Sequence, residues 1–230
     1  MNICFVSGAS SNHFKSLKNL IQSVLKFYPG EQFIVFDLGL EQKEVDDIKN
    51  MVTLEKFDYS HWPEHVNIKN DQAGGYAWKP IIIHEVAKRT GKAILWLDAG
   101  DVVVAPLEPI FGIIRKNGYF SPCSSHNIRK FCMAKTLEYI KIPDDHLDFP
   151  SIAAAIVGID INHSLGSQVL EEWFNLSLIK ECILPEGGTY ENNRHDQNIL
   201  SCLLAKNAGP NYFVPNWWGN ELIKIHCDVD

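Results

Sequence analysis

The chain has 230 residues, 46% of them hydrophobic and 21% charged, which supplies a core for one large domain or two small ones. Its formal net charge of -7 argues against general binding to nucleic acid or an anionic membrane, because a polyanion requires a basic face. No apolar run approaches the roughly 20 residues that cross a bilayer, and the first residues lack the pattern of a secretory signal. We therefore expect a cytoplasmic protein without a transmembrane segment. Six scattered cysteines with no C-x-x-C pair predict free thiols.

The first part of the chain alternates strand and helix patterns. Short β-rich runs end in small or polar residues, and between them apolar residues recur at helical spacing. The predicted elements are strand 3–7, helix 14–27, strand 32–36, helix 41–50 and strand 52–57. Residues 58–75 are rich in His, Trp, Pro, Asn and Gly, which predicts a long loop of the kind that is often functional.

The alternation continues beyond this loop. Residues 93–97 form an almost uninterrupted apolar run, as expected for a central parallel strand that is covered on both faces. The other predicted elements are helix 80–88, extended chain 102–104, helix 107–115, a second buried strand 152–159, helix 164–174, helix 195–205 and a last strand 222–227. The pattern predicts an α/β sandwich with a mostly parallel sheet. Because no linker, repeat or low-complexity run interrupts it, we predict a single domain over residues 1–230.

Polar residues at the ends of the buried strands are the first candidates for chemistry, since open α/β sheets bind ligands beyond the carboxyl ends of their strands. These residues are Ser7 with Gly8, Asp37, and Asp98 with Asp101. Ionised groups at the edge of an apolar core need a counter-charge. Mg²⁺ or Mn²⁺, bound by one or two carboxylates and phosphate oxygens, supplies one. The alternative is that Asp98 caps a turn and Asp101 is a solvated loop residue.

The segment 94–104, Ile-Leu-Trp-Leu-Asp-Ala-Gly-Asp-Val-Val-Val, resembles the Asp-x-Asp metal motif of the GT-A glycosyltransferases with one residue inserted. Residues 76–80 (Tyr-Ala-Trp-Lys-Pro), 154–159 (Ala-Ala-Ile-Val-Gly-Ile) and 194–197 (Arg-His-Asp-Gln) are similar to further elements of that family. The resemblance implies a GT-A-like three-layer sandwich with a mostly parallel central sheet. It also implies a nucleotide-sugar-binding half over residues 1–104 and an acceptor-binding half over residues 105–230. Asp101 is then the expected direct ligand of Mn²⁺ or Mg²⁺, and Asp98 contacts the metal, a metal-bound water or the donor ribose.

Three further residues have a functional and a structural interpretation. Lys79 beside a diphosphate would offset the charge on the leaving group, or it is a solvated lysine before a helix. Asp196 is a general base or an acceptor-binding carboxylate, or it caps a helix. By resemblance, His226 completes the metal site, although a hydrogen-bonded histidine at a strand end is the alternative.

The remaining assignments rest on position alone. Ser7 and Gly8 would lie where the nucleotide base enters, and Asp37 would hold the base or the ribose. Four aromatic residues near the C-terminus are candidates for stacking on a sugar or a base, or for the core, namely Tyr212, Phe213, Trp217 and Trp218.

Together these features predict a metal-dependent, hexosyltransferase-type glycosyltransferase of polysaccharide biosynthesis. It would use a nucleotide-diphosphate sugar, with a UDP-sugar favoured, and a glycan or another hydroxyl acceptor. The alternatives are a nicotinamide-dependent oxidoreductase and a non-catalytic carbohydrate-binding protein on the same fold. The turn after residue 7 lacks the later glycines of a dinucleotide site. A sugar-nucleotide pyrophosphorylase would have a Gly-rich, Arg-containing loop there, which this chain lacks.

Overall fold

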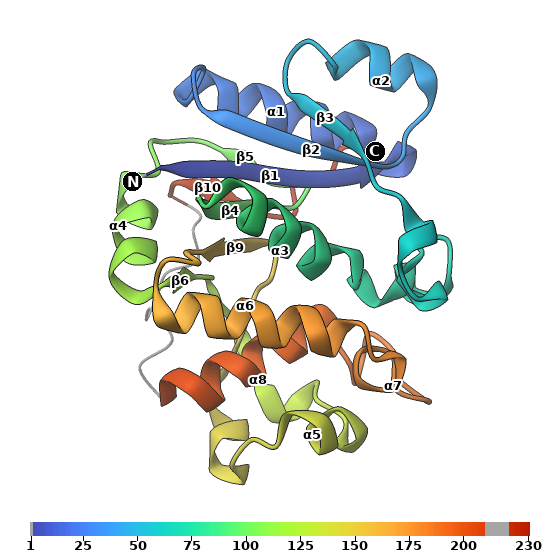
Figure 1. Ribbon diagram of the computed structural model, residues 1–230, viewed down its shortest axis with the longest axis vertical. Coiled ribbons are helices and arrows are strands. Elements are labelled where there is room, and N and C mark those ends of the chain that lie inside the picture. The colour runs from blue at the N-terminus through green and yellow to red at the C-terminus, as the bar shows by residue number, and fades with distance from the viewer. Residues whose placement is uncertain (1, 210–220) are drawn as a thin grey trace.

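The main sheet has six strands in the order β3-β2-β1-β4-β9-β6 (Figure 1). Strands β3, β2, β1 and β4 run parallel, whereas β9 lies antiparallel to both β4 and β6. The computed structural model describes residues 2–209 and 221–230. The strands of this sheet are β1 (Ile3–Ser10), β2 (Gln32–Gly39), β3 (Thr53–Lys56), β4 (Ala93–Leu97), β6 (Tyr119–Phe120) and β9 (Ile156–Ile159).

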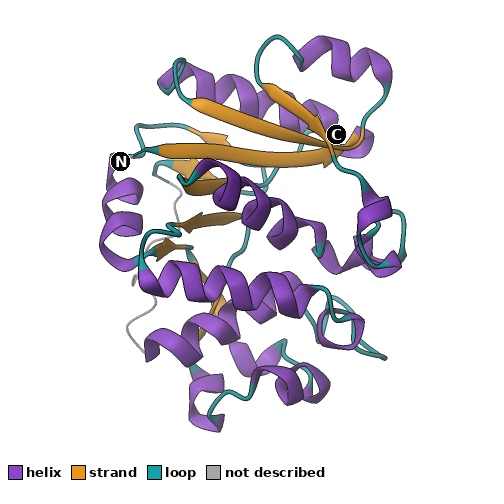
Figure 2. Ribbon diagram, viewed as in Figure 1, coloured by secondary structure: helices purple, strands orange, loops and turns teal. Residues whose placement is uncertain are grey.

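Helices cover both faces of the sheet, which makes three layers (Figure 2). They are α1 (Phe14–Phe27), α2 (Gln42–Ile48), α3 (Trp78–Thr90), α4 (Glu108–Asn117), α5 (Ala134–Ile140), α6 (Ser164–Ser177), α7 (Lys180–Ile183) and α8 (Asp196–Ala208). The predicted α/β sandwich with a mostly parallel sheet is therefore confirmed.

Alternation along the strands decides which core each side chain enters. In β1, Cys4 and Val6 pack in the core with α3, α6 and α8. Ile3 and Phe5 point to the opposite face, where they pack with α1 and α4. Because β4 has no exposed face, its five residues are all buried, and Trp96 lies in the core on the α3 side. All six cysteines are free, as predicted.

The predicted strand 152–159 is wrong as a single element. Its first part belongs to β8 (Pro150–Ile152), which pairs with β7 (Cys123–Asn127) in a separate two-stranded sheet, and its last part is β9. Between them the chain turns, and residues 153–155 face a cavity instead of a neighbouring strand. The last predicted strand is also shorter, because only β10 (Ile223–Lys224) pairs, with β5 (Val102–Val103).

The long loop after β3 contains short 3-10 turns, namely η2 (Tyr59–His61), η3 (Glu64–Val66) and η4 (Asp71–Tyr76). Residues 72–76 all have positive φ, between 51° and 67°. A left-handed run is unfavourable for the side chains of Gln72, Ala73 and Tyr76. The run ends directly before α3, whose third residue is Pro80, a first-turn position where its missing N–H costs no helical hydrogen bond.

Candidate active site

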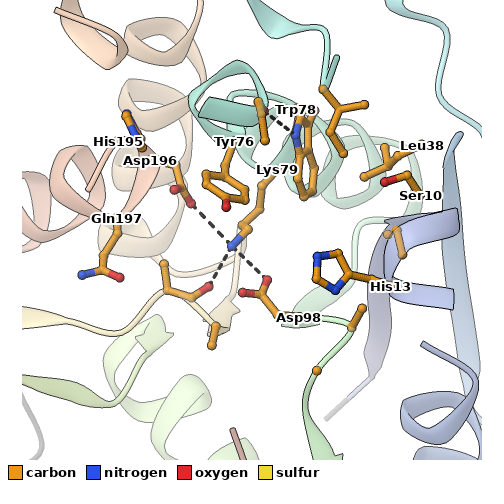
Figure 3. A pocket seen from close by; sticks show the side chains of 18 of the residues that line it. Ser10, His13, Leu38, Tyr76, Trp78, Lys79, Asp98, His195, Asp196 and Gln197 are labelled. Atoms are coloured by element: carbon orange, nitrogen blue, oxygen red, sulfur yellow. Dashed lines mark hydrogen bonds and ion pairs between the residues drawn. The ribbon is translucent and has the colours of Figure 1, made fainter. Parts of the chain in front are cut away.

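A cavity of about 600 Å³ lies at the carboxyl ends of β1, β2 and β4, where it is closed by the start of α8 and by the last residues of the chain. Six of the sequence-predicted site residues line it: Gly8, Lys79, Asp98, Asp101, Asp196 and His226. They come from segments that are far apart in the sequence. The fold therefore brings most of the predicted site together, as the close view shows for Lys79, Asp98 and Asp196 (Figure 3).

The two carboxylates after β4 are joined by a tight turn. The Asp101 N–H donates to the Asp98 carbonyl at 2.9 Å, as expected for the first and fourth residues of a β-turn. The Asp101 Oδ2 atom accepts the Asp98 N–H at 3.2 Å. A turn of this kind brings side chains three residues apart to the same end of the strand. The inserted residue of the motif therefore leaves both carboxylates on the cavity wall.

Gly100, the third residue of this turn, is needed for a close approach and not for its backbone conformation. A Cβ atom at Gly100 would lie 2.6 Å from an oxygen of the Asp228 carboxylate. Its φ is not in the left-handed region. The missing side chain thus leaves space for Asp228, which lines the same cavity.

Asp101 has the chemistry of a cation ligand. It is 1% exposed, and among the residues that the structure describes its Oδ1 atom has no hydrogen-bond partner. Burial raises the pKa of Asp101 well above the ordinary value, and the Asp98 and Asp228 carboxylates raise it further, while Lys79 lowers it. A divalent cation would supply the missing partner and offset the cost of ionising this buried carboxyl group. The donor set of carboxylate oxygens fits Mg²⁺ or Mn²⁺.

Lys79 is the centre of a buried charge network. Its Nζ atom lies 2.9 Å from Asp98 Oδ1, 3.6 Å from Asp196 Oδ2 and 3.1 Å from the Ala154 carbonyl (Figure 3). The rings of Tyr76 and Trp96 each lie 5.7 Å from this ammonium group. The side chain is 4% exposed, so the interpretation as a solvated lysine is wrong.

The charges in this network shift one another's protonation. Burial lowers the pKa of Lys79, but the adjacent Asp98 and Asp196 carboxylates outweigh it and the net pKa is raised. Burial raises the pKa of Asp196 to about 6, against the lowering effect of Lys79. Asp196 is therefore the group of this pair that titrates closest to neutral pH.

Asp196 begins α8, directly after His195, whose φ is 52°. The His195 ring is buried, with Nδ1 at 3.2 Å from the Ile183 carbonyl oxygen and, within residues 2–209 and 221–230, no partner for Nε2. Burial lowers the pKa of His195. The structure thus fixes the start of α8 through His195 and presents the Asp196 carboxylate to Lys79.

Two predicted ligand contacts are not on the cavity wall. Ser7 is fully buried and donates its hydroxyl hydrogen to the Leu97 carbonyl at 2.7 Å, so it ties β1 to β4. Asp37 accepts hydrogen bonds from the N–H groups of Gly39 and Leu40 at 2.8 and 2.6 Å, which shapes the turn after β2. Their neighbours Gly8, Leu38 and Gly39 line the cavity instead. Tyr212, Phe213, Trp217 and Trp218 lie outside the described residues.

The end of the chain supplies residues that sequence reasoning missed. Asp228 lies 3.3 Å from His13 Nδ1, and both line the cavity. Asp230 accepts hydrogen bonds from Lys15 N and from Ser16 N and Oγ, at the start of α1. Potential ligand atoms of His13, Asp228 and Asp230 lie within 4.8 Å of one another. The alternation His226-Cys227-Asp228-Val229-Asp230 was the available signal.

His226 lines the cavity as an exposed residue with φ of 56°. It follows a backbone turn, because strand pairing stops at Lys224 and the Cys227 N–H donates to the Gly100 carbonyl at 2.7 Å. This hydrogen bond fixes the last residues against the turn that carries Asp98 and Asp101. The role of His226 as a metal ligand stays a prediction.

Residues 1–84 match a family described as "Protein of unknown function (DUF1647)". The match covers less than half of the chain, from β1 into α3, and includes Lys79 but not Asp98 or Asp196. No curated protein matches the sequence. Among the described residues, none of the helices has the length and apolarity needed to cross a bilayer.

Solved structures of glycosyltransferases match the fold of nearly the whole chain. The bifunctional glycosyltransferase WbbM matches over 87% of this chain and 37% of its own length, with 14% identity and a TM-score of 0.59. The galactosyltransferase LgtC, in complex with donor and acceptor sugar analogues, matches over 89% of this chain and 71% of its own, with 17% identity and a TM-score of 0.53. Core-mannan synthase A from Aspergillus fumigatus, in its Mn/GDP form, matches over 99% of this chain and 76% of its own, with 11% identity and a TM-score of 0.54.

The chain therefore spans little more than a third of WbbM and about three quarters of the other two proteins. At these identities the likeness concerns the fold. The chain has a mixed α/β fold with a mostly parallel central sheet, and this is the GT-A-type fold of these glycosyltransferases.

Proposed function

We propose that the protein is a metal-dependent glycosyltransferase that moves a sugar from a nucleotide-diphosphate sugar to a hydroxyl group of a glycan or another acceptor. A UDP-sugar is the favoured donor. The observation that carries the proposal is the Asp101 carboxylate, which is buried and lies beside Asp98 on the wall of the cavity, with one oxygen that no described residue contacts by a hydrogen bond. Support also comes from fold neighbours in a Mn/GDP form and with donor and acceptor analogues.

The proposed metal site contains Asp98 and Asp101, with His226 or Asp228 from the end of the chain. When bound, Mn²⁺ or Mg²⁺ supplies Lewis-acid stabilisation of the diphosphate leaving group. Oxygen ligands are preferred by both ions. On this ground Asp228, which is adjacent to Gly100, is a better candidate than the imidazole of His226.

Lys79 positions the carboxylates of Asp98 and Asp196. Its short contact with Asp98 and its contact with the Ala154 carbonyl use two of its three N–H donors, and Asp196 lies near the third. The ammonium group also lowers the local negative charge where a diphosphate would bind. We therefore infer a positioning role for Lys79 together with the predicted electrostatic role.

Asp196 is the proposed acceptor-side residue. With a pKa of about 6, its carboxylate is mostly ionised at neutral pH and can accept the proton of an acceptor hydroxyl or hold that hydroxyl by a hydrogen bond. The nucleotide is proposed to lie at the opposite end, against Gly8, Leu38 and Gly39, where β1 and β2 end. Asp37 then acts through the turn that it stabilises.

The start of α1 provides an argument against a dinucleotide-binding function. In a dinucleotide-binding fold, the pyrophosphate binds at the N-terminus of the first helix. Here the Asp230 carboxylate already accepts the N–H groups of Lys15 and Ser16 at 2.9 and 3.0 Å. An anionic side chain in this place would repel a pyrophosphate, so the oxidoreductase alternative is disfavoured.

A thermal-shift screen of UDP-, GDP- and dTDP-sugars with and without Mn²⁺ tests the proposal. A ligand at about 100 times its Kd stabilises the folded state by about 2.7 kcal/mol, which corresponds to a rise in Tm of roughly 5 to 10 °C for a chain of this size. We expect this rise only with Mn²⁺ and one class of nucleotide.

Asp101→Asn should abolish the metal-dependent rise and keep the fold, because removing a buried charge with a raised pKa does not destabilise the apo-protein. Asp145→Asn, at an exposed position, is the matched control and should respond as the wild type does. An undiminished Mn²⁺ response in Asp101→Asn would refute the metal site. Stabilisation by nicotinamide dinucleotides alone would favour the oxidoreductase.

A further inference from the structure

The end of the cavity near α8 has a wall of its own chemical character. It is formed by Tyr76, Tyr190, Arg194 and His195, which we call the aromatic end. The Tyr190 hydroxyl donates to that of Tyr76 at 3.0 Å, and the Tyr190 ring packs edge-on against His195 with 5.2 Å between ring centroids. In the close view Tyr76 and His195 lie on the opposite side of Lys79 from His13 and Ser10 (Figure 3).

The backbone that carries the aromatic end is held in unfavourable conformations. Tyr76 has φ of 55° and His195 has φ of 52°, and neither residue is glycine. Each such residue costs on the order of 1 kcal/mol or more. Packing maintains the left-handed run before Tyr76, since a Cβ at Gly74 would lie 2.7 Å from the carbonyl oxygens of His65 and Val66. The structure thus fixes both rings on the cavity wall, where Tyr190 remains 42% exposed.

His195 offers a hydrogen-bond acceptor at this end. His195 is 1% exposed, and its Nδ1 lies 3.2 Å from both the Ile183 carbonyl oxygen and Asn193 Nδ2, which itself donates to that carbonyl at 3.1 Å; its Nε2 has no partner among the described residues. A neutral ring that donates from Nδ1 leaves the Nε2 lone pair free. Burial lowers the pKa of His195, which favours this neutral ring. A buried polar atom without a partner is costly, and a hydroxyl group of a bound molecule would satisfy it.

Arg194 adds a positive charge to this end of the cavity. Its guanidinium lies 4.7 Å from the centroid of the Phe131 ring, and within the described part of the chain no acidic group forms an ion pair with it. Arg89 and Arg129, by contrast, each bind carboxylates at 2.6 to 3.1 Å. A guanidinium that stacks on a ring keeps its N–H edge available, and this edge matches a carboxylate in a bidentate arrangement.

We propose that the aromatic end binds an acceptor sugar that carries a carboxylate, as a uronic acid does. The carboxylate binds Arg194, the apolar face of the sugar ring packs on Tyr190, and a ring hydroxyl donates to His195 Nε2. This inference deepens the proposed function, on which it rests, because it assigns the acceptor class to one end of the same cavity. Asp196, at the start of α8, then lies between this sugar and the donor end.

Ligand-observed NMR titrations test the inference with matched pairs of probes. Methyl β-glucuronide is compared with methyl β-glucoside, and methyl β-galacturonide with methyl β-galactoside, since each pair differs only at the carboxylate. We expect the wild type to bind at least one uronide more tightly than its neutral partner, by about tenfold, as is typical of a charged hydrogen bond. Arg194→Met should remove this preference and keep the affinity for the neutral partner.

Lys69→Met is the matched control, because Lys69 is another exposed cation on the cavity wall and is not part of the aromatic end. It should keep the uronide preference. Equal binding of both members of each pair, no binding of either uronide, or an unchanged preference in Arg194→Met would overturn the inference. Binding of UDP and GDP with Mn²⁺ is measured in the same samples by calorimetry. If no nucleotide binds while the uronide preference depends on Arg194, the proposed function fails and the carboxylate site stands.

Discussion

Replacing Lys79 with methionine removes the charge at the centre of the site and keeps nearly the same volume. Lys79 is 4% exposed and lies 2.9 Å from Asp98 and 3.6 Å from Asp196. Removing one partner of a buried ion pair leaves an uncompensated charge, which costs about 3 to 5 kcal/mol. Because typical domains have only about 5 to 15 kcal/mol of unfolding free energy, we expect Lys79→Met to lower the urea midpoint strongly at pH 7.5.

A second substitution identifies the source of this loss. The pKa of Asp196 rises from 3.8 to about 6 on burial, so its ionisation costs about 3 kcal/mol in the folded state even with Lys79 present. Without Lys79 the cost is larger. The double variant Lys79→Met/Asp196→Asn should therefore be more stable than Lys79→Met by about 3 kcal/mol.

Lys49→Met is the control, because Lys49 also lies 2.7 Å from an aspartate, Asp46, but on the surface. Exposed pairs contribute at most about 1 kcal/mol, so this variant should unfold almost as the wild type does. The reasoning is refuted if Lys79→Met is within about 1 kcal/mol of Lys49→Met. It is also refuted if Asp196→Asn fails to recover any stability in the double variant.

Four single substitutions give three more predictions. The pKa of Asp196 is higher in the folded state, about 6, than its ordinary value of 3.8, so its contribution to stability is full below pH 3.8 and is lost as the pH rises through about 6. Asp196→Asn should therefore flatten the fall in urea stability between pH 4.5 and 7.5. Parallel pH profiles of the wild type and this variant would contradict the prediction. Gly166→Ala, whose Cβ would lie 2.3 Å from a backbone oxygen, should cost about 1 to 3 kcal/mol in urea unfolding. Gly112 lies in α4 with open space around it, so Gly112→Ala should instead stabilise the fold by about 0.5 to 1 kcal/mol. A Gly112→Ala variant less stable than Gly166→Ala would contradict this packing. Gly100→Ala displaces the Asp228 carboxylate, so we expect weaker Mn²⁺ binding by calorimetry, and an unchanged affinity would place Asp228 outside the metal site.

The local features of this fold were predictable because short-range patterns determine them. The bounds of α1 and β4 coincide with the predicted ones, since helical spacing and an unbroken apolar run have clear ends. Asp98 and Asp101 follow β4 directly, so their place at the edge of the sheet could be inferred without knowing which strands pair. Lys79 is the second residue of α3 and Asp196 the first of α8, and only the tertiary fold shows that their charged groups meet.

The other features depend on distant partners. Side chains alternate along β1, so Ser7 lies on the same face of the sheet as Phe5. The sequence does not show which face of the sheet borders the cavity. The split of residues 150–159 into β8 and β9 depends on β7 and β4, which lie elsewhere in the chain. Asp228 reaches Gly100 only because Cys227 and Asp230 are hydrogen-bonded to the turn after β4 and to α1. A short polar segment carries no periodicity that predicts such contacts.

Crystals grown with MnCl₂ and a nucleoside diphosphate, with data collected at the manganese absorption edge, test the central claim most directly. We predict an anomalous peak within about 2.0 to 2.6 Å of an Asp101 carboxylate oxygen, the range of metal–oxygen bonds to hard divalent cations. We also expect phosphate oxygens on the same ion. A peak confined to His13, Asp228 and Asp230, with none at Asp101, would contradict the account.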